Sequence, residues 1–201
     1  MSSMSGGIEV DICVIGAGSG GLSVAAGASQ LGASVALVER RLMGGDCLNF
    51  GCVPSKALLA AGKSAHNIAG AARFGITSAA PGIDQKAVRQ HVRDVIAAIA
   101  PHDSIERFRA LGVNVILGAA RFTGPREIQV DGQTIRARRF VVATGSSPVV
   151  PAIPGLDGVP YLTNETLFEY DQPMAHLIVI GAAPSGSRCP RRIGVWAWRS
   201  R

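Results

Sequence analysis

The N-terminal segment constrains the fold more than any other part of the chain. A short apolar run over residues 11–15 ends in a glycine-rich stretch over 16–21. The run lacks polar alternation, which predicts a strand buried in a parallel sheet. Small apolar residues over 22–31 predict a helix closed by Gly32, and residues 34–39 predict the next strand. Together they predict a β-α-β unit of about 30 residues, the building block of an α/β fold.

The glycine-rich stretch has the spacing G-x-G-x-x-G, at Gly16, Gly18 and Gly21, and Glu39 ends the following strand. Between a strand and a helix, the first glycine makes a tight turn and the second lets the backbone approach a pyrophosphate. The third lets the helix pack on the sheet. The phosphates then lie at the helix N-terminus, and the acid accepts hydrogen bonds from a ribose hydroxyl pair. Such a turn also occurs in ordinary α/β units, but this context predicts dinucleotide binding and disfavours a 2′-phosphate.

Cys47 and Cys52 lie just ahead of a predicted helix over residues 54–72. Two buried packing thiols would be the usual fate of such cysteines. A zinc site needs further ligands, and only His66 is close in sequence. The position before a helix N-terminus, with Lys56 nearby, favours a thiolate, which disulfide exchange requires. A redox pair therefore fits best.

The remaining pattern alternates helix and strand signals. It predicts a helix over 84–111 broken or kinked at Pro101, a strand over 113–122, a β-hairpin over 126–137, a buried strand over 139–145, and a new strand-then-glycine unit over 176–184. Asp131 and Gly132 suit the hairpin turn. The Pro- and Gly-rich residues 146–160 predict a domain boundary.

Most of the formal charge of +6 comes from the C-terminal segment. All 14 acidic residues precede Pro184, whereas residues 185–201 hold five arginines, both tryptophans and no acid. This distribution argues against a nucleic-acid-binding face, and we expect no nucleic-acid partner. No stretch has the pattern of a secretion signal or the length of a membrane span, so we expect a cytoplasmic protein with no membrane contact.

The block G-G-D-C-L-N-F-G-C-V-P-S-K over 44–56, with G-A-G-S-G-G before it and A-T-G-S-S-P after it, resembles the class I pyridine nucleotide–disulfide oxidoreductases. These FAD enzymes include dihydrolipoamide dehydrogenase, glutathione reductase and mercuric reductase. The resemblance extends nearly to Pro184 and is nearest to mercuric reductase-like and dihydrolipoamide dehydrogenase-like members, without separating them.

The resemblance implies an α/β fold in which a Rossmann-like FAD-binding domain, a parallel sheet with a β-hairpin or meander layer, is followed by the first strand of a second Rossmann domain. The implied organisation is a flexible N-terminus over 1–7, the FAD-binding domain over 8–150, a linker and the start of the NAD(P) domain over 151–175, its first strand and glycine turn over 176–184, and an aberrant tail over 185–201.

The resemblance also implies residue roles. Cys47 would be the interchange thiol that meets the substrate and Cys52 the thiol that faces the flavin, together a redox-active disulfide. Lys56 would lie near the flavin nitrogen that takes hydride. The implied FAD-binding residues are Gly16, Gly18 and Gly21 at the pyrophosphate, Glu39 at the adenosine ribose, Gly45 and Asp46 along the phosphates, Ala120 at the adenine, and Thr144 and Gly145 in a turn beside FAD. The implied reaction passes a hydride from NAD(P)H to FAD and on through the cysteines to a disulfide or metal-ion substrate. No resident metal is implied.

The resemblance breaks in the second Rossmann unit. The family pattern is I-V-I-G-x-G-P-I-G-x-E, whereas this chain has I-V-I-G-A-A-P-S-G at the corresponding position, with Ala183 in place of a glycine. The match to the pattern ends after Pro184. With plausible GC-rich codons, a one-base shift at this point restores a family-like helix. We therefore expect a frameshift, and an N-terminal fragment of a homodimeric reductase that is itself inactive. The alternative is a non-catalytic fragment that at most binds adenine nucleotide or FAD weakly.

Overall fold

The computed structural model describes residues 7–170 and 176–180. These residues form two units. Unit 1 contains residues 7–49 and 99–147, and unit 2 contains residues 50–98, 148–170 and 176–180. Unit 1 carries the sheet and the glycine-rich turn, whereas unit 2 is built mainly from two long helices.

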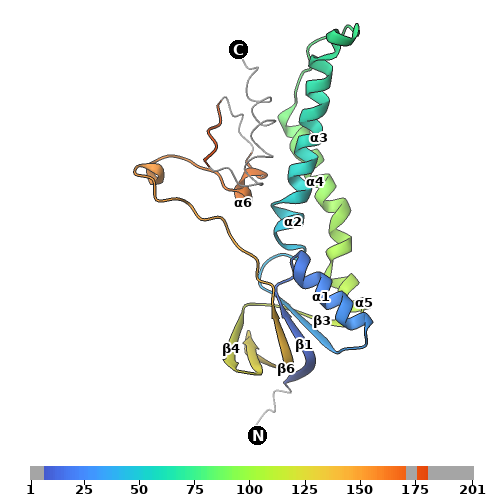
Figure 1. Cartoon of the computed structure of the whole chain (residues 1–201), viewed down its shortest axis with the longest axis vertical. Helices are drawn as coiled ribbons and strands as arrows, with labels where there is room; N and C mark the ends of the chain where they lie inside the picture. Colours follow the sequence, from blue (N-terminus) through green and yellow to red (C-terminus); the bar gives the residue numbers. More distant parts are fainter. Residues whose placement is uncertain (1–6, 171–175, 181–201) are drawn as a thin grey trace. The chain divides into compact units, whose positions relative to one another are not determined.

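Unit 1 is organised around one six-stranded sheet in the order β3-β2-β1-β6-β5-β4 (Figure 1). The strands are β1 Ile8–Ile15, β2 Val35–Glu39, β3 Val113–Leu117, β4 Ala120–Gly124, β5 Glu127–Val130 and β6 Gln133–Val142. Strands β3, β2, β1 and β6 are parallel, whereas β5 and β4 continue the sheet as an antiparallel meander. The predicted Rossmann-like parallel sheet with a meander is confirmed.

Strand β6 joins the two parts of this sheet. The sequence predicted a hairpin over 126–137 and a separate buried strand over 139–145, and this division was wrong. One ten-residue strand pairs with β5 through Gln133–Arg136 and with β1 through Ile135–Val142. Its second half is not buried throughout, because Arg138, Arg139 and Val142 are exposed. The predicted turn is confirmed, because Asp131 and Gly132 both have positive φ, 47° and 87°.

The strand predicted over 113–122 is two strands. β3 and β4 lie at opposite edges of the sheet, and Gly118 separates them. This glycine has a φ of 148°, and a Cβ there would lie 2.5 Å from both Asp131 Oδ2 and Val130 Cγ1. Because only glycine fits, the apolar pattern could not continue as one strand through this point.

The helical elements of unit 1 are α1 Ser19–Gln30, α2 Gly45–Asn49, the 3-10 turn η2 Ala100–Asp103 and α5 Ile105–Ala110. Helices α1 and α5 pack on one face of the sheet. Helix α1 begins three residues before the predicted start, because the last glycines of the fingerprint form its first turn. The break predicted at Pro101 is confirmed: η2 contains this proline, and Ser104 caps α5 by accepting the Arg107 N–H at 3.2 Å.

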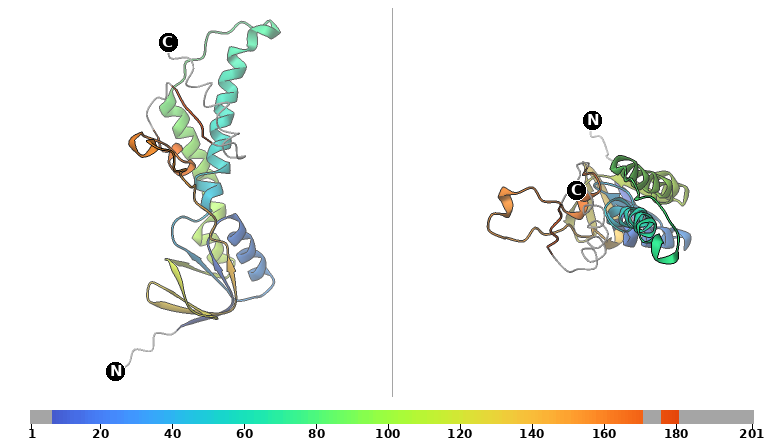
Figure 2. Two further views of the ribbon diagram at one scale, coloured as in Figure 1. Left: turned by 60° about the vertical axis from the view of Figure 1, so that its left-hand side comes forward. Right: turned by 90° about the horizontal axis from the view of Figure 1, so that it is seen from above.

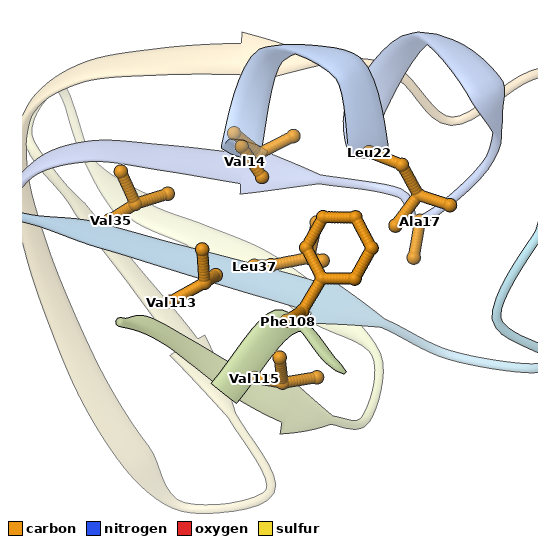
Figure 3. Close-up of a cluster of buried hydrophobic side chains, with 9 residues drawn as sticks. Val14, Ala17, Leu22, Val35, Leu37, Phe108, Val113 and Val115 are labelled. Carbon is orange, nitrogen blue, oxygen red and sulfur yellow. The ribbon is translucent and has the colours of Figure 1, made fainter. Parts of the chain in front are cut away.

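The main core lies between these helices and the sheet (Figure 3). Phe108 of α5, 2% exposed, lies over Leu37 and near Val115. The other buried members of this cluster are Val14, Ala17, Leu22, Ala25, Val35 and Val113. A second cluster on the opposite face contains Val10, Cys13, Ala36, Val38, Ile128, Val130, Ile135 and Ala137. Strand β2 is buried along its whole length because it contributes to both clusters.

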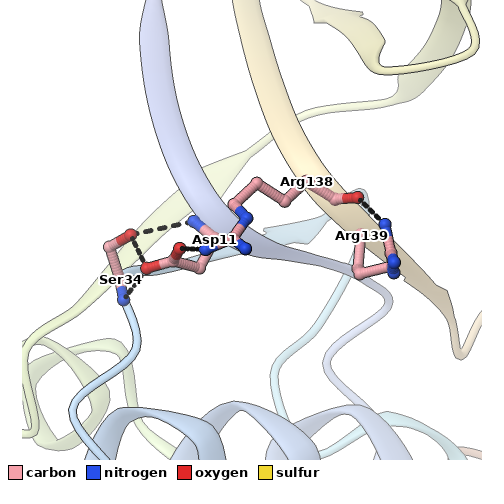
Figure 4. A network of polar contacts seen from close by, with 4 residues as sticks. All are labelled: Asp11, Ser34, Arg138 and Arg139. Carbon is pink, nitrogen blue, oxygen red and sulfur yellow. Dashed lines mark hydrogen bonds and ion pairs between the residues drawn. The ribbon is translucent and has the colours of Figure 1, made fainter.

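A polar network ties three segments of the sheet (Figure 4). The Asp11 carboxylate in β1 accepts hydrogen bonds from the Ser34 hydroxyl at 2.7 Å, the Ser34 N–H at 3.0 Å and the Arg138 guanidinium at 3.0 Å. The Ser34 hydroxyl, its N–H and then Arg138 lower the pKa of Asp11 to about 2. Arg139 donates to the Arg138 carbonyl at 2.9 Å. The network joins β1, the entry to β2 and β6.

Unit 2 contains α3 Cys52–Ala69, η1 Ala71–Phe74, α4 Gln85–Ile99, η3 Leu156–Gly158 and α6 Asn164–Leu167. Helix α3 is one continuous helix, as the left view of Figure 2 shows. It starts two residues before the predicted position, and Pro54 lies in its first turn. No helix among the described residues is long and apolar enough to cross a membrane.

The strand predicted over 176–184 is not formed where the structure describes it. Residues 176–180 have no strand, and Ile178 and Ile180 are 78% and 61% exposed. A strand needs a hydrogen-bonded neighbour, and the described part of the chain provides none for this segment. Residues 181–184, the predicted tail over 185–201 and residues 1–6 of the predicted flexible N-terminus lie outside the described residues.

Candidate functional site

The turn between β1 and α1 is shaped by glycines that the protein itself requires. Gly16 has a φ of 107°, and its N–H donates to the Val38 carbonyl at 2.8 Å. A Cβ on Gly16 would lie 2.7 Å from the carbonyl carbon of Ala143. A Cβ on Gly21 would lie 3.0 Å from the carbonyl carbon of Gly16 and closer still to its oxygen. Both glycines therefore allow the helix and two strand ends to approach one another.

Gly18 is different, because the surrounding protein does not require it. Its φ of −81° and ψ of −177° are open to any residue, and the nearest atom to a Cβ would be the Gly45 Cα at 3.9 Å. Gly18 is the N-cap of the 12-residue helix α1, whose first turn contains no acidic residue. The N–H groups at a helix N-terminus favour an anion. The absence of a side chain at Gly18 leaves the backbone at this helix N-terminus open to a group from outside the chain.

The start of α2 packs on this turn. The Gly44 N–H donates to the Ala17 carbonyl at 2.9 Å. Gly45 has a φ of 56°, and a Cβ there would lie 2.6 Å from the Gly18 Cα. The contact between Gly18 and Gly45 brings Asp46, an exposed residue in the first turn of α2, to the same end of the sheet.

Glu39 lies at the end of β2 and is 9% exposed. Its Oε2 accepts the Ala17 N–H at 2.6 Å and its Oε1 accepts the Arg41 N–H at 2.7 Å. A carboxylate has about four acceptor positions, so two remain for other donors. This capacity matches the pair of hydroxyls on a ribose.

The remaining predicted residues follow neighbouring strand ends. Ala120 opens β4 two residues after Gly118, whose N–H donates to the Glu39 carbonyl at 2.8 Å. Thr144 follows β6, and its Cα lies 3.1 Å from the position of a Cβ on Gly16. Gly145 follows directly, with a φ of 66°. The carboxyl ends of β1, β2, β3 and β6 therefore meet at one edge of the parallel sheet, which is where such folds bind ligands.

Three residues at this edge were missed by sequence reasoning. Ala17 is fully buried and uses both its N–H and its carbonyl within the turn, Gly44 donates to it, and Gly118 ties the β3–β4 turn to Glu39. Gly44 belongs to the recognised glycine–cysteine block, so its neighbourhood in sequence could have indicated it. Nothing in the sequence pattern marks the backbone contacts of Ala17 and Gly118.

These residues fit the implied FAD. The backbones of Gly18 and Gly45 lie against each other without side chains, and we call this surface the Gly18–Gly45 cradle; a diphosphate can approach the backbone there. The buried carboxylate of Glu39 lies at the same edge of the sheet and could accept the ribose hydroxyls. The site shows no sign of a metal centre: among the described residues, no group of three or more His, Cys, Asp or Glu could hold an ion.

The two cysteines of the predicted redox pair lie in different units. Cys47 is the third residue of α2 and half-buried, whereas Cys52 is the first residue of α3 and exposed. Neither Cys47 nor Cys52 is in a disulfide. The prediction that both would lie at the start of one helix holds for Cys52, with exposed Lys56 one turn later, whereas Cys47 lies in a separate short helix. Gly51 is the N-cap residue of α3 and lies two residues after the end of α2 at Asn49.

A third thiol, Cys13 in β1, is fully buried in the second core cluster. Burial raises the pKa of Cys13 to about 11. It is therefore a neutral packing residue at physiological pH.

The family profile described as pyridine nucleotide-disulphide oxidoreductase matches residues 10–190. The chain belongs to this family. It is 37% identical over 182 residues to a mercuric reductase from Streptomyces lividans, covering 88% of this chain and 38% of the relative. It is 42% identical over 139 residues to a dihydrolipoyl dehydrogenase from Thermus scotoductus, covering 69% of this chain and 30% of the relative.

A solved structure supports the fold of this family member. The HOCl-induced flavoprotein disulfide reductase RclA from Escherichia coli matches with a TM-score of 0.68 over 83% of this chain and 35% of that chain, at 24% identity. At this identity the likeness shows the fold alone. The chain spans 30–38% of the length of the two curated relatives described above. The predicted family and fold are confirmed.

Proposed function

We propose that this chain is the FAD-binding and dithiol-bearing region of an NAD(P)H-dependent reductase whose substrate is a disulfide or a metal ion. Membership of the family supports FAD and a nicotinamide cofactor in general. The observation that carries the proposal for this chain is Gly18, whose lack of a side chain is needed by no neighbouring protein atom. The relatives include both mercuric reductases and dihydrolipoyl dehydrogenases, which supports either substrate class.

The residues of unit 1 would hold the cofactor. The N–H groups that open α1 would bind the diphosphate over the Gly18–Gly45 cradle, and Glu39 would accept the ribose hydroxyls. The backbone at Ala120 and at 144–145 would line the remaining edge. When bound, FAD would relay electrons between the nicotinamide and the thiols.

The cysteines would carry the substrate step. The Cys47 thiolate would attack one sulfur of a substrate disulfide, forming a mixed disulfide and releasing the first substrate thiol. The Cys52 thiolate would then attack Cys47, releasing the second thiol and leaving a Cys47–Cys52 disulfide. Two electrons and two protons thus leave the dithiol for the substrate. For a soft metal ion, the same two thiolates would be the ligands.

Binding of FAD to the full chain tests the cofactor assignment. Gly18→Ala adds a methyl group that the protein can accommodate, at 3.9 Å from the Gly45 Cα, but that enters the space proposed for the diphosphate. Gly20→Ala is the matched control, because a Cβ there meets nothing within 4 Å. We expect wild type and Gly20→Ala to retain FAD in equilibrium dialysis and Gly18→Ala to bind at least about tenfold more weakly, with an unchanged unfolding midpoint. A wild-type chain that does not bind FAD, or equal binding by all three, would reject the assignment.

A further inference from the structure

Glu39 makes contacts that ribose binding alone does not explain. Its side chain and main chain together bind three turns. Its Oε2 accepts a hydrogen bond from the Ala17 N–H before α1, and its Oε1 accepts one from the Arg41 N–H before α2. Its backbone carbonyl accepts one from the Gly118 N–H after β3. These contacts join the three loops that form the edge of the candidate site.

The contact with Ala17 answers a need of the protein itself. Ala17 is fully buried, and its N–H lies in a turn and outside any strand or helix ladder. A buried N–H without an acceptor is destabilising, and hydrogen bonds to charged acceptors are among the stronger ones. The 2.6 Å bond to the Glu39 carboxylate satisfies this N–H. The carboxylate is itself nine-tenths buried and has two N–H donors to stabilise its charge.

We infer that Glu39 is a positioning residue, which fixes the glycine-rich turn in its binding shape before any nucleotide arrives. The inference deepens the proposed function and rests on it only for the ligand part of the test below. Because the Ala17 N–H is directed at Glu39, a diphosphate binds to the N–H groups that follow it, from Gly18 onward. Preorganisation of this kind lowers the ordering cost of binding.

Substitution of Glu39 by glutamine separates this role from a structural one. Glutamine has the same shape but only one acceptor oxygen, and its NH2 group would face one of the two N–H donors. At least one turn therefore loses its bond. Glu9→Gln is the matched control, because Glu9 is exposed on β1 and its substitution makes the same change in charge.

Residue-resolved amide hydrogen exchange of the ligand-free full chain is the first measurement. We expect the Ala17 and Arg41 amides to be protected in wild type and Glu9→Gln. In Glu39→Gln we expect at least one of the two to exchange at least about tenfold faster, the ratio for loss of one charge-assisted bond. A wild-type chain whose Ala17 amide exchanges freely overturns the inference. That result needs no variant, so it decides the question even if Glu39→Gln does not fold.

Binding of ADP and of 2′,3′-dideoxy-ADP is the second measurement, since the dideoxy probe lacks the hydroxyls that Glu39 would accept. A positioning role predicts that Glu39→Gln weakens both probes. A role confined to the ribose predicts that it weakens ADP alone, and this result overturns the inference. If neither probe binds the wild-type chain, the proposed function fails, whereas the exchange of Ala17 still decides the role of Glu39.

Discussion

Adjacent glycines at the start of α1 should respond in opposite ways to the same substitution. A Cβ on Gly21 would lie 3.0 Å from the carbonyl carbon of Gly16, closer to its oxygen, and 3.3 Å from Val14 Cγ1. A Cβ on Gly20 would meet nothing within 4 Å. Since carbon atoms rest about 3.5–4.0 Å apart and the Gly16 oxygen is closer still, Gly21→Ala must push α1 away from β1 by at least roughly 0.5–1 Å.

The expected energies follow from these contacts. Overpacking costs about 1–3 kcal/mol, and Gly21→Ala belongs at the upper end because the obstacle is backbone that cannot rotate away. Gly20→Ala replaces a glycine, which has a low helix propensity, with alanine, and should stabilise the helix by up to about 1 kcal/mol. For a chain of this size, about 2–4 °C of melting temperature corresponds to 1 kcal/mol. We therefore expect Gly21→Ala to melt roughly 6–12 °C below wild type and Gly20→Ala to melt at or slightly above it.

Thermal unfolding followed by far-UV circular dichroism measures both variants under identical conditions. The reasoning depends on the close approach of α1 to the turn at Gly16. Equal melting temperatures for Gly20→Ala and Gly21→Ala would show that this approach does not exist, and the packing argument for the third fingerprint glycine would be refuted.

Four further predictions concern other parts of the chain. The pKa of Asp11 is about 2 in the folded chain and about 3.9 in an unfolded chain, so the ionised Asp11 should stabilise the fold above about pH 4 and lose this effect as the pH falls toward 2. In Asp11→Asn the urea-unfolding midpoint should therefore depend less on pH in this window than it does in wild type. An unchanged pH profile would contradict this prediction. In the native chain at pH 8, iodoacetamide should modify Cys52, which is exposed, and not Cys13, whose pKa is raised to about 11, as peptide mass mapping will show. Phe108→Ala should lower the free energy of unfolding by about 3–5 kcal/mol, because this ring is 2% exposed in the main core; a loss below about 1 kcal/mol would contradict the packing. The coding DNA around Pro184 should restore a family-like G-x-E helix after a one-base shift, and DNA with no such frame would reject the frameshift.

The sequence predicted the parts of the fold that depend on local pattern. Apolar runs and glycine spacing placed β1, α1 and β2, and Pro101 marked the break between α4 and α5. The division of β3 from β4 was not predictable in this way. It depends on the crowding of Gly118 by residues of the β5–β6 turn, a contact that only the folded sheet creates.

The candidate site was predictable to a similar extent. The glycines and Glu39 follow from their types and spacing, and the structure brings them to one edge of the sheet. The hydrogen bonds of Glu39 to Ala17 and Arg41 are made to backbone groups, which every residue carries, so no sequence signal marks them. The positions of Cys47 and Cys52 in two helices likewise depend on Gly51, whose φ of −126° and ψ of −108° interrupt the helical path.

The most direct test of the proposed function is the absorption spectrum of the FAD-loaded full chain during partial reduction, compared with Cys52→Ser. If the chain binds FAD and Cys52 faces the flavin, a long-wavelength charge-transfer band should appear in wild type and be absent in the variant. A colourless chain that retains no FAD would contradict the proposal and leave a fragment that at most binds adenine nucleotide. A flavin-containing chain with the same spectrum in both proteins would contradict the role of Cys52.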